Sequence, residues 1–172
     1  MKTFINPLAK SVLLTLAVAA APALAGGPST TGALATKANR IVGTWSGVGD
    51  VSGANCFPAS PNGPAIKPRN YLMYNAGGTI TELPRIPVST SPSPRTIGVG
   101  NWYYEPESDT YYVSFRFDWY DAGVLKGYGT VDREIKLDEG GDSLSGSVVA
   151  VRYLENGTEV FSQCGTGTAT RI

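Results

Sequence analysis

Eight segments with the composition and alternation of β-strands fill the chain from residue 40 to its end, and none has the period of a helix. Turn-forming residues separate them, including Asn156-Gly157, a pair that favours a two-residue hairpin. The alternation is clearest where Phe115, Phe117 and Trp119 share one face of a strand. The pattern therefore predicts an all-β protein. The expected strands are residues 41–51, 66–75, 79–83, 97–105, 110–120, 124–137, 144–154 and 158–171.

The connections between these segments alternate in length. The second, fourth and sixth are tight turns, whereas the first and third, residues 52–70 and 84–96, are long and carry four prolines each. In an antiparallel meander, successive connections lie at opposite ends of the sheet, so we expect both long connections at the same end. Closure would remove the exposed edges of the sheet. The sequence thus predicts an eight-stranded, antiparallel, up-and-down β-barrel, which either fills with side chains or holds one small ligand.

The N-terminus has the pattern of an export signal. A basic start precedes a short apolar run over residues 12–20, and Ala23-Leu24-Ala25 offers the small residues that signal peptidase accepts. The alternative is a membrane anchor, but the run is shorter than the roughly 20 residues that span a bilayer. We therefore expect a signal peptide over residues 1–25, a flexible segment over residues 26–39 and a single barrel domain over residues 40–172. The expected location is a bacterial periplasm or the extracellular space.

Charge and cysteine content narrow the possible partners and chemistry. Without Lys2 and Lys10, the chain carries 12 basic against 14 acidic residues, and the basic ones are scattered. Nucleic acid and anionic membranes are therefore poor candidate partners. Cys56 and Cys164 lack the close spacing of a reactive thiol pair, and exported cysteines pair by default. We expect a structural disulfide between them.

Several kinds of site are excluded by composition. The chain has no His, which rules out His-dependent triads and His-based metal sites. The acidic residues lack the spacing of a calcium loop. Residues 98–100 and 127–129 are Gly-x-Gly triplets inside strand segments, so we interpret them as places where the barrel bends and not as phosphate loops. The sequence implies no cofactor and no metal.

The two ends of the barrel sequence are expected to meet. Trp45 lies near the start of the first strand and Arg171 at the finish of the last, and strand alternation brings both to one end of the barrel. A guanidinium across the indole would form a cation–π contact worth roughly 0.5–2 kcal/mol. With Gly43, these residues resemble the Gly-x-Trp and late Arg of the lipocalins and the wider calycin group. Residues 137–142 depart from the Thr-Asp type motif that lipocalins usually carry in this turn.

The resemblance implies an eight-stranded barrel, structural roles for Gly43, Trp45 and Arg171, and a cavity for a small apolar molecule. Two charged residues within strand segments are the candidate catalytic groups, Glu82 and Arg133. Arg133 shares its face with Val131 and would suit a carboxylate or an enolate if it points inward, although a solvated position is the commoner outcome. Aromatic residues could line the cavity or simply fill the core. The expected ligand-binding residues are Tyr71, Met73, Trp102, Phe115, Phe117, Trp119 and Arg133.

Three functions remain open from the sequence. The first is an exported barrel that binds a small hydrophobic molecule in its cavity. The second is an isomerase or cyclase similar to allene oxide cyclase and dirigent proteins, in which Glu82 supplies a buried acid. The third is an inhibitor of an envelope protease or lysozyme, with residues 26–39 inserted into its target.

Overall fold

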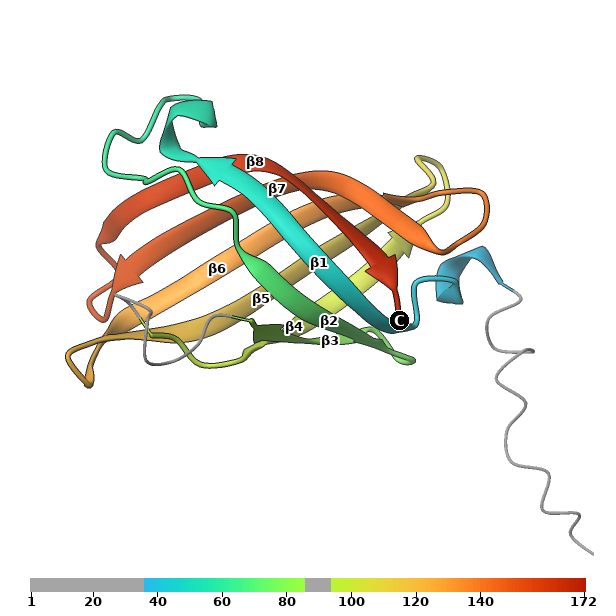
Figure 1. The fold of residues 1–172 in the computed structure, drawn as a ribbon, viewed down its shortest axis with the longest axis horizontal. Coiled ribbons are helices and arrows are strands. Elements are labelled where there is room, and N and C mark those ends of the chain that lie inside the picture. Colours follow the sequence, from blue (N-terminus) through green and yellow to red (C-terminus); the bar gives the residue numbers. More distant parts are fainter. Residues whose placement is uncertain (1–35, 86–93) are drawn as a thin grey trace, which may run out of the picture.

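The computed structural model describes residues 36–85 and 94–172 of this chain. Within them, eight antiparallel strands form a closed barrel in which each strand pairs with its neighbours in the sequence and β1 pairs with β8 (Figure 1). The predicted all-β, up-and-down barrel is confirmed. The strands are β1 (Gly43–Ser52), β2 (Arg69–Asn75), β3 (Thr79–Pro84), β4 (Gly98–Glu105), β5 (Thr110–Asp121), β6 (Val124–Leu137), β7 (Ser143–Leu154) and β8 (Glu159–Arg171).

The two ends of the barrel differ. The tight β2–β3, β4–β5 and β6–β7 turns lie together at the end we call the closed end, on the right in Figure 1. The long β1–β2 connection, which contains the one-turn 3-10 helix η2 (Gly53–Asn55), lies at the opposite end, which we call the mouth. Residues 94–96 of the β3–β4 connection pair there with the last residues of β5.

A disulfide fastens the first connection to the last strand. Cys56 and Cys164 are bonded, which confirms the predicted pairing. Two hydrogen bonds also join this connection to β8. The Ser162 amide donates to Ser60 Oγ at 3.0 Å, and the Gln163 side chain donates to the Pro64 carbonyl. In the chain-entropy view, a cross-link across 108 residues stabilises the fold by about 4–5 kcal/mol.

Large side chains fill the closed half of the barrel. Tyr74 and Trp102 pack edge to face with ring centroids 6.4 Å apart, and both are buried. This packing leaves the mouth half as the part of the interior with room for a guest. The fully or almost fully buried members of the closed-half core include Ile41, Trp45, Leu72, Ile80, Tyr111, Ile135 and Leu144.

A short N-terminal element covers the closed end. Residues 37–39 of the segment expected to be flexible form the 3-10 helix η1 (Lys37–Asn39). The Tyr111 hydroxyl donates to the Lys37 carbonyl, and Lys37 Nζ lies 3.2 Å from Asp109 Oδ2. The expected signal peptide, residues 1–25, lies outside the described residues. Within residues 36–85 and 94–172, no helix is long and apolar enough to cross a bilayer.

The expected contact between Trp45 and Arg171 is present at this end of the barrel. The Arg171 guanidinium lies 4.2 Å from the Trp45 ring centroid. It also donates to three backbone carbonyls, those of Arg40 at 2.5 Å, Val42 at 2.8 Å and Gly141 at 3.0 Å. Gly43 has a φ of +138°, a conformation that residues with a side chain rarely adopt, and a Cβ there would lie 2.6 Å from Arg171 Nη1. Glycine therefore suits both the backbone conformation and the close approach of Arg171.

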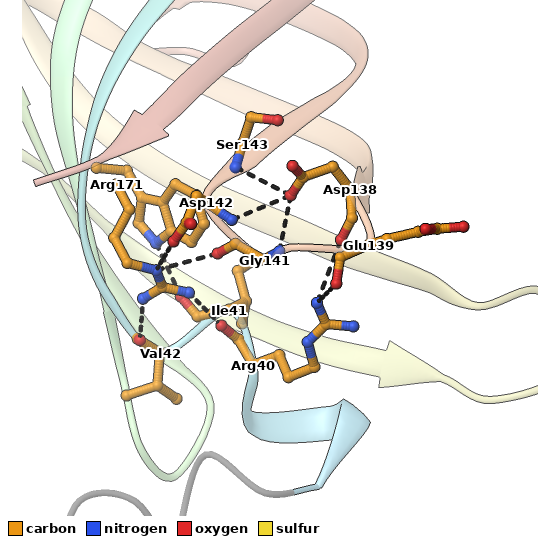
Figure 2. Close-up of polar contacts among 10 residues, drawn as sticks. Arg40, Ile41, Val42, Asp138, Glu139, Gly141, Asp142, Ser143 and Arg171 are labelled. Atoms are coloured by element: carbon orange, nitrogen blue, oxygen red, sulfur yellow. Dashed lines mark hydrogen bonds and ion pairs between the residues drawn. The ribbon is translucent and has the colours of Figure 1, made fainter.

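The β6–β7 turn takes part in this closure although it departs from the lipocalin pattern. Asp138 Oδ1 accepts bonds from the Gly141, Asp142 and Ser143 amides at 2.8, 3.0 and 3.0 Å (Figure 2). These bonds, led by that of Ser143, hold the pKa of Asp138 below its usual range. The turn so fixed presents the Gly141 carbonyl to Arg171.

Candidate functional site: a cavity in the mouth half of the barrel

A cavity of about 100 Å³ lies inside the mouth half of the barrel. Its walls come mainly from apolar side chains of β5, β6 and β7, with residues of the β1–β2 connection at its rim. The apolar lining includes Val51, Phe115, Phe117, Val131, Val148 and Ala150. The polar lining residues are Asn70, Glu82, Arg95, Arg133, Arg152 and Gln163.

Two glycines on neighbouring strands make room for the phenylalanine rings. A Cβ at Gly98 would lie 2.6 Å from the Phe115 ring, and a Cβ at Gly129 would lie 2.3 Å from the Phe117 ring. Both distances are shorter than a carbon–carbon contact, so a larger residue at either position would displace the ring that it meets. One glycine of each Gly-x-Gly triplet, Gly98 and Gly129, therefore leaves the space that a phenylalanine ring occupies.

Glu82 is completely buried and bound by an arginine from the β3–β4 connection. Its Oε1 and Oε2 accept bonds from Arg95 Nη2 and Nη1 at 2.6 and 2.7 Å. The same guanidinium lies 4.4 Å from the Phe117 ring centroid. This two-pronged pair fixes the connection to the barrel interior and engages both oxygens of the carboxylate.

Arg133 points into the barrel from β6 and is only 7% exposed. Its Nε has no hydrogen-bond partner among the described residues. A Cβ at Gly167, on β8, would lie 2.7 Å from Arg133 Nη2, so the absence of a side chain there gives the guanidinium its place. The Tyr74 hydroxyl oxygen is the second buried polar atom without a partner in the described chain. Burial raises the pKa of Tyr74, and the charge of Arg133 opposes that rise.

Arg152 lies nearer the mouth on β7. Its guanidinium is 5.3 Å from the Trp119 ring centroid and 5.5 Å from that of Phe161. Burial lowers the pKa of Arg152, and the positive charge of Arg95 lowers it further. The interior of the mouth half is thus rich in positive charge.

The structure brings four of the sequence candidates together at the cavity, namely Glu82, Phe115, Phe117 and Arg133. Trp102 belongs to the closed-half core, where its indole N–H lies 3.1 Å from the carbonyls of both Asn75 and Thr79.

The other three candidates lie away from the cavity lining. Trp119 is half-buried beside the mouth and donates to the Tyr153 carbonyl at 3.0 Å. Tyr71 and Met73 lie on the outer face of β2, because Leu72 and Tyr74 take the inner face. Tyr71 is 37% exposed, with the Arg85 guanidinium 4.7 Å from its ring centroid.

Sequence reasoning did not single out four of the polar lining residues. Arg152 shares its strand face with Val148 and Ala150, so the alternation of β7 could have placed it inside. Gln163 alternates in the same way with Gly167 on β8. Arg95 lies outside a strand, where no periodicity applies. Asn70 lies at the start of β2, where the pattern was ambiguous.

In the described part of the chain, no three His, Cys, Asp or Glu side chains converge to hold a metal ion. No protein-family model matches the chain, and a comparison with curated protein sequences finds no match. The architecture is compatible with that of the calycins, but a barrel of this kind does not determine function by itself.

Proposed function

We propose that this chain is an exported barrel protein that binds one small, mainly apolar molecule in the mouth half of its barrel. The observation that carries the proposal is the cavity between Phe115, Phe117, Val131 and Val148, next to a closed half that is packed with side chains. Binding sites for small molecules are typically apolar hollows with a few placed polar groups. The β1–β2 connection, fastened by the disulfide, supports a stable rim for such a site.

The volume of the cavity limits the guest. An apolar protein cavity of about 150 Å³ accommodates one benzene molecule, and the cavity here measures about 100 Å³. The guest is therefore a single-ring or short-chain molecule that the cavity encloses only in part, so that the rest of it extends through the mouth.

Export is supported by the pattern of the first 25 residues and by the disulfide. Disulfides persist in oxidising compartments, which include the bacterial periplasm and the exterior.

The alternative functions have less support. For an isomerase or cyclase, the best acid is Glu82, but both of its oxygens are bound by Arg95. For an inhibitor with an inserted arm, the segment in question is residues 26–39, of which residues 26–35 lie outside the described residues.

Native mass spectrometry tests the binding function. The chain is expressed with its own N-terminus in a bacterial host, purified gently and weighed before and after denaturation. We expect a small extra mass that denaturation removes, on a polypeptide cleaved after Ala25 and two hydrogens short because of the disulfide.

A matched pair of variants shows whether the bound molecule occupies the barrel cavity. Ala150→Phe fills the cavity and should abolish the extra mass. Val149 is 40% exposed on the outer face of the same strand, so Val149→Phe should retain the extra mass. A bare polypeptide that also binds no single-ring or short-chain probe would refute the proposed function.

A further inference from the structure

The structure points to a charged anchor for the guest. We infer that Arg133 holds the carboxylate of a small organic acid, an assignment that rests on the proposed function and names its ligand class. Three observations carry the inference: the charge balance of the cavity, the missing partners of Arg133, and the cradle that the barrel builds for its guanidinium.

The charge balance of the cavity is positive. Four ionisable side chains line it, Glu82, Arg95, Arg133 and Arg152. Glu82 and Arg95 neutralise each other through two short bonds. Among the described residues, no carboxylate lies within 4.0 Å of the remaining two arginines. A guest with a negative charge would therefore complete the site.

The missing partners of Arg133 are evident from a comparison with the other interior arginines. Arg171 donates to three carbonyls, and Arg95 donates to both oxygens of Glu82. Arg152 lies against two aromatic rings. Arg133 is 7% exposed, and its Nε has no partner in the described chain. A guanidinium removed from water is unfavourable unless an anion and hydrogen bonds compensate it.

The cradle for Arg133 is built into two strands. Gly167 leaves the space into which Arg133 Nη2 reaches, and Val148 packs beside the same position, 3.1 Å from where a Cβ of Gly167 would be. The guanidinium of Arg133 lines the cavity, and its planar fork of donors matches a planar, two-oxygen acceptor, which is the shape of a carboxylate.

The position of Arg133 sets the orientation of the guest. Arg133 pairs with Val148 on β7, whereas Arg152 lies four residues further toward the mouth. At about 3.3 Å per residue, the two charges are separated by about 13 Å along the strand. The carboxylate therefore lies deep, and the apolar part of the acid lies against Phe115 and Phe117 toward the mouth.

Pairs of probes that differ only in charge test this assignment. Benzoate is compared with benzyl alcohol, and hexanoate with hexan-1-ol, by isothermal titration calorimetry on the mature, disulfide-bonded protein at fixed ionic strength. We expect each acid to bind at least ~10-fold more tightly than its alcohol, a difference of about 1.4 kcal/mol. Sulfate and phosphate, titrated alone, should bind more weakly than the organic acids.

Variants assign the preference to Arg133. Arg133→Gln should remove the preference for acids, so that each acid binds about as tightly as its matching alcohol. Gly167→Ala should weaken acid binding while Arg133 keeps its charge, because the new Cβ displaces the guanidinium. The control is Arg116→Gln, an exposed arginine that lies over Tyr128 on the outer face, and it should bind acids as the wild type does.

The stability of the ligand-free protein gives a second readout. Arg133→Met keeps the apolar stem and removes an uncompensated charge, so the midpoint of thermal unfolding should rise. A fall in that midpoint together with unchanged acid binding would show that Arg133 is structural and would overturn the inference.

The outcomes also separate this inference from the proposed function. Equal binding of acids and alcohols would overturn the acid as ligand class and leave small-molecule binding intact. Tighter binding of sulfate or phosphate at Arg133 would replace the organic acid with an inorganic anion. Failure of all probes, with no extra mass in the native spectrum, would refute the proposed function itself.

Discussion

Replacement of Glu82 by Gln removes the one negative charge that lines the cavity in the described structure. The Glu82 side chain is 0% exposed and its partner Arg95 is 15% exposed. Breaking a buried ion pair by removing one partner costs about 3–5 kcal/mol, since the other charge is left uncompensated. Here Arg95 retains some contact with water and the glutamine oxygen can still accept one bond. We therefore expect a loss near the lower limit, about 3 kcal/mol.

Urea denaturation, monitored by tryptophan fluorescence, measures this loss in the free energy of unfolding. With an m-value of about 2 kcal/mol/M, the midpoint should fall by about 1.5 M while m stays unchanged. The matched control is Glu134→Gln, which removes an exposed carboxylate on β6. Substitutions of this kind change the free energy of unfolding by about 0.5 kcal/mol or less.

A double variant tests whether the loss comes from the uncompensated charge. In E82L/R95M, both charges are absent and apolar side chains take their place, a change that is often neutral or stabilising for buried pairs. We expect the double variant to be more stable than Glu82→Gln. The reasoning would be refuted if Glu82→Gln cost no more than Glu134→Gln, or if the double variant were as unstable as the single one.

Three further predictions concern the framework around the cavity. Removal of the disulfide in C56S/C164S should cost about 4–5 kcal/mol in non-reducing urea denaturation, and an unchanged midpoint would contradict its role. Arg171→Lys should lower the free energy of unfolding by about 2 kcal/mol and alter the near-UV circular dichroism of Trp45, because an ammonium cannot bind three carbonyls and also cover the indole. Wild-type stability of this variant would argue against the role of Arg171. Burial, the largest cause, raises the pKa of Tyr111 to about 12, so stability should be constant below about pH 10, the unfolded value, and fall toward pH 12. Tyr111→Phe should reduce this loss of stability at alkaline pH, measured as the midpoint of thermal unfolding against pH. A profile identical to that of the wild type would show that Tyr111 does not cause the loss.

The number and order of the strands could be predicted because turn residues and alternation agreed along most of the chain. β6 begins and ends at the residues expected, and the other strands differ by three residues or fewer at each end. On β5, Phe115 and Phe117 alternate with Ser114 and Arg116, so the inner face was unambiguous. Strand alternation placed Trp45 and Arg171 at the same end, and closure of the barrel brings them into contact.

The polar part of the site was harder to predict. On β2, Tyr71, Leu72, Met73 and Tyr74 are all apolar or aromatic, so the sequence contains no contrast to show which pair faces inward. Pairing with β1 decides this, because Leu72 lies opposite the buried Trp45. Arg95 reaches Glu82 from a connection, and only the folded barrel brings the two together.

A crystal structure of the mature protein with the tightest-binding acid of the probe series tests the central claim most directly. We predict that the acid lies inside the mouth half of the barrel, with its carboxylate within hydrogen-bond distance of the Arg133 guanidinium and its apolar part against Phe115 and Phe117. An acid bound outside the barrel, or bound inside with its apolar end toward Arg133, would contradict that claim.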